Sequence, residues 1–176
     1  KLFTTASAFL RRNARRDNFF LWLDCFDPHE PWDAPPEFVR MYDTTEGYDG
    51  RIDPRLLTWA ARSSREEPLP ESIIRRQTAL YDAKVSWVDR WFGLLLDTLE
   101  ETKLDRNTAV VVTADHGTNL HEWGQFGKTG PPREQEARVP LLLHFPDGRT
   151  GRSDRIVQPQ DIFATVLDMA GAEAPP

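Results

Sequence analysis

The sequence predicts an α/β fold in which a mostly parallel sheet is sandwiched by helices. Two apolar runs, Ala109–Thr113 and Asn18–Phe26, are nearly continuous, which is typical of strands buried on both faces. Between them Glu71–Lys103 repeats apolar residues at steps of three, four and seven, as an amphipathic helix does. Strand, helix and strand in this order predict a β-α-β unit with parallel strands.

The remaining elements follow from shorter patterns in the chain. We expect helices at Thr4–Arg16, Pro35–Val39 and Gln160–Ala170, a third strand at Leu141–Phe145 and a short strand at Ile156–Val157. Residues 42–69 show no period and many turn formers, which indicates an irregular surface excursion, and Thr129–Glu136 is predicted to be a polar loop. The long helix would approach ~50 Å at ~1.5 Å per residue, so we allow for a break in it.

Length, charge and cysteine content limit the classes of function. With 176 residues, positions 1–176 are expected to form one domain. The 22 Lys and Arg against 28 Asp and Glu give a net charge of −6, which argues against binding nucleic acid through its phosphates but not against a small anionic substrate. Cys25 is the only cysteine, so no internal disulfide exists, and no apolar run reaches the ~20 residues that span a membrane. Because the chain has no initiator Met, we expect a piece of a longer protein.

Polar residues follow the Ala109–Thr113 strand at the place where α/β sheets bind ligands. Asp115 and His116 come directly after the apolar run, and ligands of open α/β sheets bind beyond the carboxyl ends of strands. A carboxylate beside an imidazole can bind a divalent cation, although Asp-His-Gly is also common in helix caps and turns. The next stretch, rich in glycine and aromatic residues, adds His121 and Lys128 as candidates.

The loop after the Asn18–Phe26 strand offers a further histidine. In Asp27-Pro28-His29-Glu30-Pro31 the prolines are expected to hold the backbone extended and to forbid a helix. A stiff loop at a strand end can fix one imidazole in a cleft. The alternative is that His29 merely forms hydrogen bonds with the backbone of its own loop.

Taken in order, these pieces resemble the sulfatases of the alkaline phosphatase-like superfamily. The segments that resemble the family are D-P-H-x-P at Asp27–Pro31, Y-x-A-x-V-x-x-x-D from Tyr81 to Asp89, T-A-D-H-G followed by G-x-F-G-K up to Lys128, Arg138–Leu141, and Asp161–Gly171. The resemblance covers nearly the whole chain and implies an alkaline phosphatase-like α/β fold that is incomplete here. It also implies hydrolysis of a sulfate monoester.

The resemblance implies a role for each candidate residue. Asp115 and His116 match two metal ligands, Lys128 matches the lysine that contacts the sulfate and the nucleophile, and His29 matches the histidine near the leaving-group oxygen. Ca²⁺ is favoured from the family, with Mn²⁺, Zn²⁺ or Mg²⁺ left open because one ligand is an imidazole. Many relatives carry a histidine where Trp123 stands, and His121, two places earlier, is kept as a catalytic candidate in its place.

The chain also departs from the family pattern. The nucleophile, a formylglycine made from the cysteine of C-x-P-x-R, is expected outside this chain, because Cys25 is followed by Phe-Asp-Pro-His. The chain alone is therefore expected to be inactive. The expected partner is a small-molecule or saccharide sulfate ester. A phosphate or phosphonate monoester hydrolase of the same superfamily and a non-catalytic binding module of the same fold remain alternatives, and the sequence leaves compartment and oligomeric state open.

Overall fold

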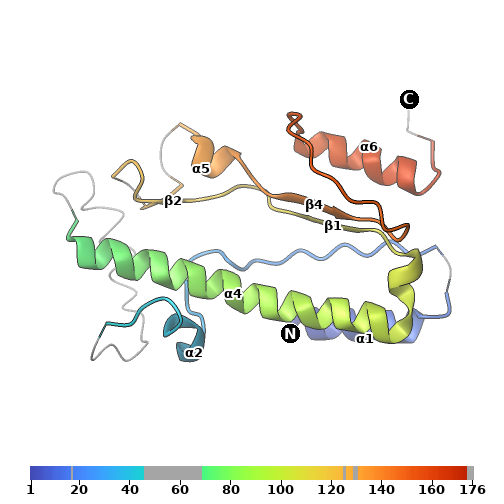
Figure 1. Cartoon of the computed structure of the whole chain (residues 1–176), viewed down its shortest axis with the longest axis horizontal. Helices are drawn as coiled ribbons and strands as arrows, with labels where there is room; N and C mark the ends of the chain where they lie inside the picture. The colour runs from blue at the N-terminus through green and yellow to red at the C-terminus, as the bar shows by residue number, and fades with distance from the viewer. Residues whose placement is uncertain (17, 46–68, 125, 129–130, 174–176) are drawn as a thin grey trace.

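The structure is a computed structural model that describes residues 1–16, 18–45, 69–124, 126–128 and 131–173 (Figure 1). Most of the predicted surface excursion, at 46–68, lies outside the described residues. Within the described ranges no helix is both long enough and apolar enough to cross a membrane.

A single long helix, α4 (Glu71–Thr102), runs the length of the molecule (Figure 1). Pro70 precedes it, where a missing N–H costs nothing, and Glu71 places a carboxylate in its first turn. The helix ends at Lys103, whose backbone is left-handed at φ 61°, and continues into a short 3₁₀ turn, η1 (Leu104–Asn107). The predicted helix is confirmed, and the break that its length allowed does not occur.

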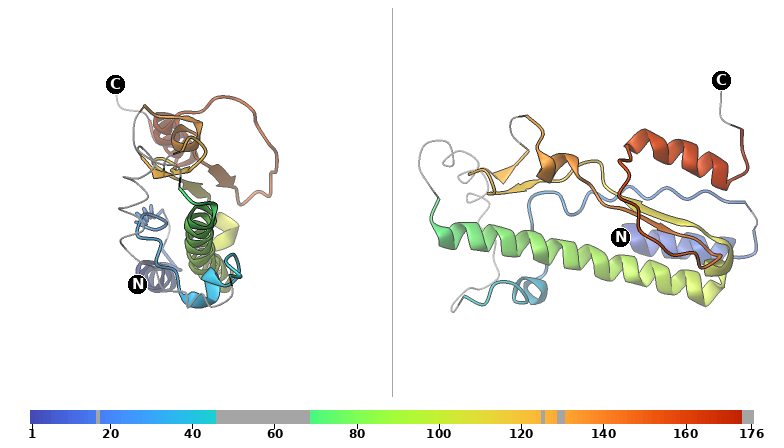
Figure 2. Two further views of the ribbon diagram at one scale, coloured as in Figure 1. Left: turned by 90° about the vertical axis from the view of Figure 1, so that its left-hand side faces the viewer. Right: turned by 45° about the horizontal axis from the view of Figure 1, so that its top comes forward.

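Two apolar clusters hold the chain together, one at each half of α4. Helix α1 (Leu2–Asn13) packs on the C-terminal half and α2 (Pro36–Val39) on the N-terminal half, as Figure 2 shows. The buried members of the first cluster are Ala6, Leu10, Leu95 and Leu99. Those of the second are Trp32, Ala34, Val39, Leu69, Leu80, Ala83 and Phe126.

The buried face of α4 differs from the apolar stripe that the sequence predicts. Val85, which the stripe includes, is 41% exposed, whereas Lys84 beside it is buried. The ammonium of Lys84 has carboxylate partners in Asp27 and Asp33 on the loop that packs against this face of the helix. A pattern that counts only apolar residues does not predict that a lysine is buried.

The described strands pair antiparallel, and the parallel pairing predicted between Asn18–Phe26 and Ala109–Thr113 does not form among the described residues. Strand β1 (Val110–Thr113) pairs with β4 (Leu141–His144), in a register that places Val110 opposite His144. A small hairpin joins β2 (Asn119–Leu120) to β3 (Phe126–Gly127). Both strand segments predicted around β1 and β4 do form. An apolar run indicates burial but does not specify the neighbouring strand or its direction.

The segment Asn18–Phe26, predicted as a strand covered on both faces, is extended but forms no strand with the described residues. It runs along α4 (Figure 1), with Phe19, Leu21 and Leu23 against the first cluster. The alternate side chains Phe20 and Trp22 are 68% and 71% exposed. Successive side chains of an extended chain point to opposite sides, and only one side is covered here.

Helix α6 (Pro159–Met169) confirms the predicted C-terminal helix and lies on the side of β4 away from α4 (Figures 1 and 2). A capping box between Gln158 and Asp161 starts it, and Gly171 follows its end at φ 63°. The short strand predicted at Ile156–Val157 is absent from these described residues, since Ile156 is 94% exposed and has no pairing partner. The predicted polar loop at 129–136 contains the start of a one-turn helix, α5 (Glu134–Ala137).

Candidate functional site

The loop from Asp27 to Asp33 is a compact turn rather than the extended segment that its prolines suggested. Both X-Pro bonds, Asp27–Pro28 and Glu30–Pro31, are cis. The indole N–H of Trp32 donates a hydrogen bond to the Pro28 carbonyl at 3.0 Å, and the indole is buried against Tyr81 in the second cluster. The loop is therefore anchored to the core directly beside His29.

His29 presents one ring nitrogen away from its loop. Its Nδ1 lies 2.7 Å from the Glu30 backbone oxygen, and because a carbonyl only accepts, this nitrogen carries the proton in the bond. The ring stacks on Phe26 at 4.3 Å between centroids and is held in one plane. The backbone hydrogen bond that we considered as the alternative is present, and it leaves Nε2 free for a ligand.

Glu30 connects this loop to Lys128, which lies 98 positions further along the chain. The Glu30 carboxylate accepts a hydrogen bond from Lys128 Nζ at 3.1 Å and lies 3.3 Å from His29 Nδ1. Burial raises the pKa of Glu30, but its own backbone N–H and Lys128 outweigh that effect, so the net pKa lies below the usual range. The carboxylate is ionised at neutral pH and joins the His29 loop to Lys128.

Hairpin β2–β3 places Lys128 at this position. Gly127, just before the lysine, adopts φ 82°, which favours glycine, and a Cβ there would lie 3.7 Å from Glu30 Oε1. The side-chain amide of Asn119 donates a hydrogen bond to the Gly127 carbonyl at 2.9 Å. Asn119 is buried, so the hairpin is fixed from inside the protein.

Asp115 and His116 follow β1, as the sequence predicts. The His116 N–H donates to Asp115 Oδ1 at 2.9 Å, and the other carboxylate oxygen lies 3.7 Å from His116 Nε2. His116 Nδ1 lies 2.8 Å from the Gly117 carbonyl and must carry the proton there. A Cβ at Gly117 would meet the Gln135 carbonyl at 2.1 Å, so only glycine fits the turn that follows the pair.

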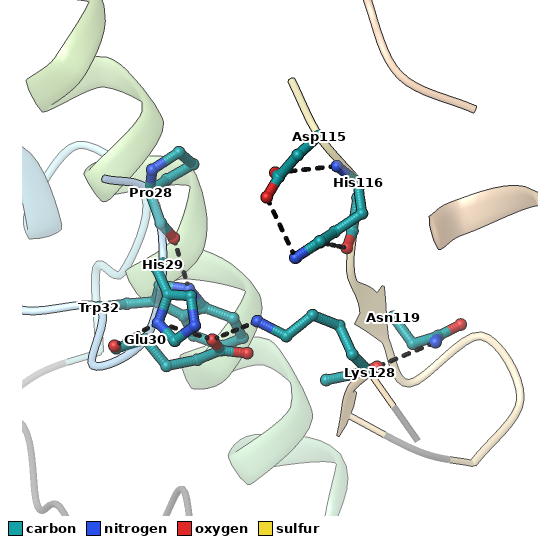
Figure 3. A network of polar contacts seen from close by, with 10 residues as sticks. Pro28, His29, Glu30, Trp32, Asp115, His116, Asn119 and Lys128 are labelled. Carbon is teal, nitrogen blue, oxygen red and sulfur yellow. Dashed lines mark hydrogen bonds and ion pairs between the residues drawn. The ribbon is translucent and has the colours of Figure 1, made fainter. Parts of the chain in front are cut away.

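These side chains face one another across the space between the two segments (Figure 3). The Asp115 carboxylate and the His116 ring point toward the side on which Lys128 reaches Glu30 and His29. Four of the five residues predicted from the sequence are therefore gathered around one space, although they come from two distant parts of the chain.

Asp115 and His116 fit part of the coordination shell of a divalent cation. They offer a carboxylate that is 89% exposed and, 3.7 Å from one of its oxygens, the Nε2 of an imidazole whose Nδ1 is hydrogen-bonded to the Gly117 carbonyl. The described residues contain no group of three or more His, Cys, Asp or Glu that could hold a metal ion. A cation bound to this pair would need ligands in addition to those described.

His121, the fifth predicted residue, packs against the hairpin and forms no hydrogen bond with these four side chains among the described residues. It lies in the turn after β2 with φ 80°, and its ring packs on Phe126 at 5.4 Å between centroids. Neighbouring Trp123 is 58% exposed, donates its indole N–H to Gln135 and carries Arg133 over its ring at 4.5 Å. None of the hydrogen bonds among the described residues joins either side chain to His29, Lys128 or the Asp115–His116 pair.

Two residues near the site could not be found from the sequence. Glu30 is polar and sits in a loop, so nothing in its spacing indicates Lys128 as a partner. Lys84 is a lysine on an amphipathic helix, which ordinarily faces solvent, and only the structure shows that it is buried against Asp27 and Asp33. Burial raises the pKa of the Cys25 thiol.

Comparison with known proteins assigns the chain to a family. The family model described as Sulfatase matches residues 1–172. The chain is 32% identical over 151 residues to iduronate 2-sulfatase of Mus musculus, covering 75% of this chain and 27% of the relative. It is 30% identical over 164 residues to endo-4-O-sulfatase of Bacteroides thetaiotaomicron, covering 87% of this chain and 29% of the relative. The chain thus spans less than a third of the length of these relatives.

Solved structures agree with the sequence comparison. Ps i-CgsB, in complex with k-i-k-neocarrahexaose, matches with a TM-score of 0.69 and 25% identity over 99% of this chain and 34% of that one. YidJ from Bacteroides fragilis matches with a TM-score of 0.71 and 22% identity over 96% of this chain and 36% of that one. These likenesses confirm the α/β fold class of the alkaline phosphatase-like superfamily. The family match and the two relatives together show that the chain belongs to the sulfatase family.

Proposed function

We propose that this chain supplies one part of the active site of a hydrolase that cleaves a sulfate monoester. The observation that carries the proposal is the ionic link from Lys128 through Glu30 to His29, with Asp115 and His116 facing the same space (Figure 3). A sulfate ester develops negative charge on the sulfuryl oxygens and on the leaving oxygen as the ester bond breaks. Positive and proton-donating groups held in advance around that position stabilise the transition state.

Each residue has a distinct part in the proposed reaction. The Lys128 ammonium binds a sulfuryl oxygen and neutralises charge that grows there. As the sulfur–oxygen bond of the ester breaks, its electron pair goes to the leaving oxygen, which takes a proton from Nε2 of doubly protonated His29. Glu30 stays ionised beside both groups and keeps them in place. The attacking oxygen is expected from a formylglycine outside this chain.

Asp115 and His116 are the proposed ligands of a divalent cation, with Ca²⁺ favoured and Mn²⁺, Zn²⁺ or Mg²⁺ as alternatives. When bound, the ion supplies positive charge beside the sulfuryl oxygens. The family membership supports a metal, and the free lone pairs of the exposed Asp115 carboxylate are consistent with it.

The proposed substrate class is a sulfated saccharide. Two of the relatives are an iduronate 2-sulfatase and an endo-4-O-sulfatase, and Ps i-CgsB was solved with k-i-k-neocarrahexaose. The shallow, exposed setting of Asp115 and His116 suits a large ester that is covered by other parts of the protein. Smaller alkyl and aryl sulfates remain substrates to test.

The experiment uses protein expressed from the complete open reading frame. Release of 4-nitrophenol is compared between 4-nitrophenyl sulfate, 4-nitrophenyl phosphate and a 4-nitrophenyl phosphonate, and sulfate release is measured from sulfated oligosaccharides. We expect kcat/KM to be highest for a sulfate ester. A preference for the phosphate or phosphonate would favour the other hydrolase class, and no turnover of any ester would favour a binding module.

The metal proposal is tested by the metal content of the same protein. Asp115→Asn should lower the bound divalent metal, measured by elemental analysis after dialysis, relative to the exposed control Asp154→Asn. Unchanged metal content in Asp115→Asn would contradict the proposed ligand.

A further inference from the structure

Lys84 is a buried cation that the proposed reaction does not use. It lies on α4 and is 6% exposed. Its ammonium lies 2.9 Å from Asp27 Oδ1 and donates a hydrogen bond to Asp33 Oδ1 at 2.5 Å. These two carboxylates stand at the two ends of the turn that carries His29 in its middle.

The charge of Lys84 is maintained inside the fold. Burial lowers the pKa of its ammonium, but the hydrogen bonds to Asp33 and Asp27 outweigh burial, so the pKa is raised above its usual range. Removing an ammonium from water is offset by carboxylates only when the geometry is well fixed. An apolar side chain would fill the same space on α4 without directional contacts, so this lysine acts on the position of the loop.

Other contacts of the loop involve the residues next to Asp27 and Asp33. Trp32, next to Asp33, donates to the Pro28 carbonyl and is buried against Tyr81. The His29 N–H donates to the Phe26 carbonyl at 3.0 Å, next to Asp27. The residues next to the partners of Lys84 thus hold the backbone on both sides of His29, and Phe26 also stacks on its imidazole.

We propose that Lys84 is a positioning residue for His29: by joining Asp27 to Asp33 it closes the loop and fixes the imidazole relative to Lys128. This inference rests on the proposed function, in which His29 protonates the leaving oxygen. Lys84 touches neither substrate nor metal in this arrangement.

The test measures how the rate depends on the leaving group. Poor leaving groups need protonation most, so a displaced His29 slows them more than good ones. In protein expressed from the complete open reading frame, kcat/KM is measured for a series of aryl sulfates from 4-nitrophenyl to phenyl. Lys84→Met should steepen the plot against leaving-group pKa, with a loss for phenyl sulfate on the order of 10²-fold and a much smaller loss for 4-nitrophenyl sulfate.

Three further variants separate the possible outcomes. His29→Ala must steepen the same plot; if it does not, the proposed role of His29 fails, and this inference with it. Leu95→Ala, buried on the same helix in the other cluster, is the control for instability and should leave the slope unchanged. The side chain of Asp33 is 64% exposed, so Asp33→Asn should fold even if Lys84→Met does not. It should steepen the slope less than Lys84→Met does. The positioning role would be overturned if His29→Ala steepens the slope while folded Lys84→Met and Asp33→Asn keep the wild-type slope. The proposed role of His29 would then still stand.

Discussion

The smallest unit of the site is the trio of His29, Glu30 and Lys128. Glu30 is the only acidic partner of Lys128 among the described residues, at 3.1 Å, and it holds the imidazole at 3.3 Å. In the proposed function, a sulfate ester that enters the site would share or replace this carboxylate on Lys128. We therefore expect the strength of substrate binding to depend on competition between two anions for one ammonium.

Replacing Lys128 tests that competition directly. Lys128→Ala removes the ammonium and should lower kcat/KM for 4-nitrophenyl sulfate by about 10²- to 10³-fold, the usual effect of losing one preorganised charge-stabilising donor. Arg152→Ala, at a side chain that is 87% exposed, is the matched loss of a cation and should leave the rate unchanged. Equal kcat/KM values for Lys128→Ala and wild type would contradict a role of this lysine in the reaction.

The sequence predicted Asp115 and His116 from their place after an apolar run, and His29 and Lys128 from ordered motifs of a family. The structure shows where these four side chains lie, and their roles stay predictions. The contact of Glu30 with Lys128 and the burial of Lys84 were not predicted, because each depends on segments brought together only by tertiary packing. His121 was kept because it lies near a position that relatives fill with histidine; its backbone has a positive φ and its ring packs on Phe126.

At the scale of elements, α4 is the support on which both sides of the site are built. Its N-terminal half carries Lys84 and the second cluster, and its C-terminal half holds α1 through Leu95 and Leu99. Periodicity predicted α4, α6 and the segments of β1 and β4, since each depends on local pattern. The direction of strand pairing and the single covered face of Asn18–Phe26 depend on neighbours, so the sequence did not supply them.

The first cluster should contribute strongly to stability. Leu95→Ala leaves a cavity against Ala6 and Leu10 and should lower the free energy of unfolding by about 2–5 kcal/mol, measured by urea denaturation. Leu96→Ala, at a leucine that is 38% exposed, is the control and should change it by less than about 0.5 kcal/mol. Similar losses for the two variants would contradict the cluster as described.

A buried carboxylate ties the turn after α2 to α4 and makes stability depend on pH. Asp43 accepts hydrogen bonds from the Thr45 N–H at 3.0 Å and from Arg76 at 3.3 Å. Burial raises the pKa of Asp43, but Thr45 and Arg76 outweigh burial, so its folded pKa lies below the ordinary 3.8. A depressed folded pKa stabilises the protein above the unfolded pKa, and the contribution is lost as pH falls through the folded value.

Asp43→Asn should therefore destabilise the protein at pH 7, by about 1.5–3 kcal/mol for lost charged hydrogen bonds. The difference from wild type should shrink as pH falls below about 4. Urea denaturation at pH 7, 5 and 3.5 measures it, with Asp154→Asn as the exposed control. If the difference in the free energy of unfolding between Asp43→Asn and wild type grew as the pH fell, it would contradict a lowered pKa of Asp43 in the folded protein.

At the scale of the whole molecule, the described structure leaves several large apolar side chains exposed to solvent. Phe20, Trp22, Phe26, Leu142 and Phe163 are each at least 60% exposed. Such exposure marks surfaces that other protein covers. The relatives are more than three times as long as the matched part, so we expect the complete protein to cover these residues and to supply the nucleophile.

The 176-residue chain expressed alone should therefore be inactive and should bind a hydrophobic dye such as ANS. Dye fluorescence per mole should be higher than for protein from the complete open reading frame, and no aryl sulfate should be turned over. Enzyme-like turnover by the chain alone would show that a nucleophile lies within residues 1–176 and would overturn the assignment of roles.

The central claim is that residues far apart in the chain hold one sulfate ester between them. The most direct measurement is a crystal structure of the complete protein with a sulfamate analogue of its substrate. The account predicts the sulfuryl group within hydrogen-bond distance of Lys128 Nζ, the ester oxygen at His29 Nε2, and a cation bound by Asp115 and His116. An analogue bound away from Lys128 and His29 would contradict it.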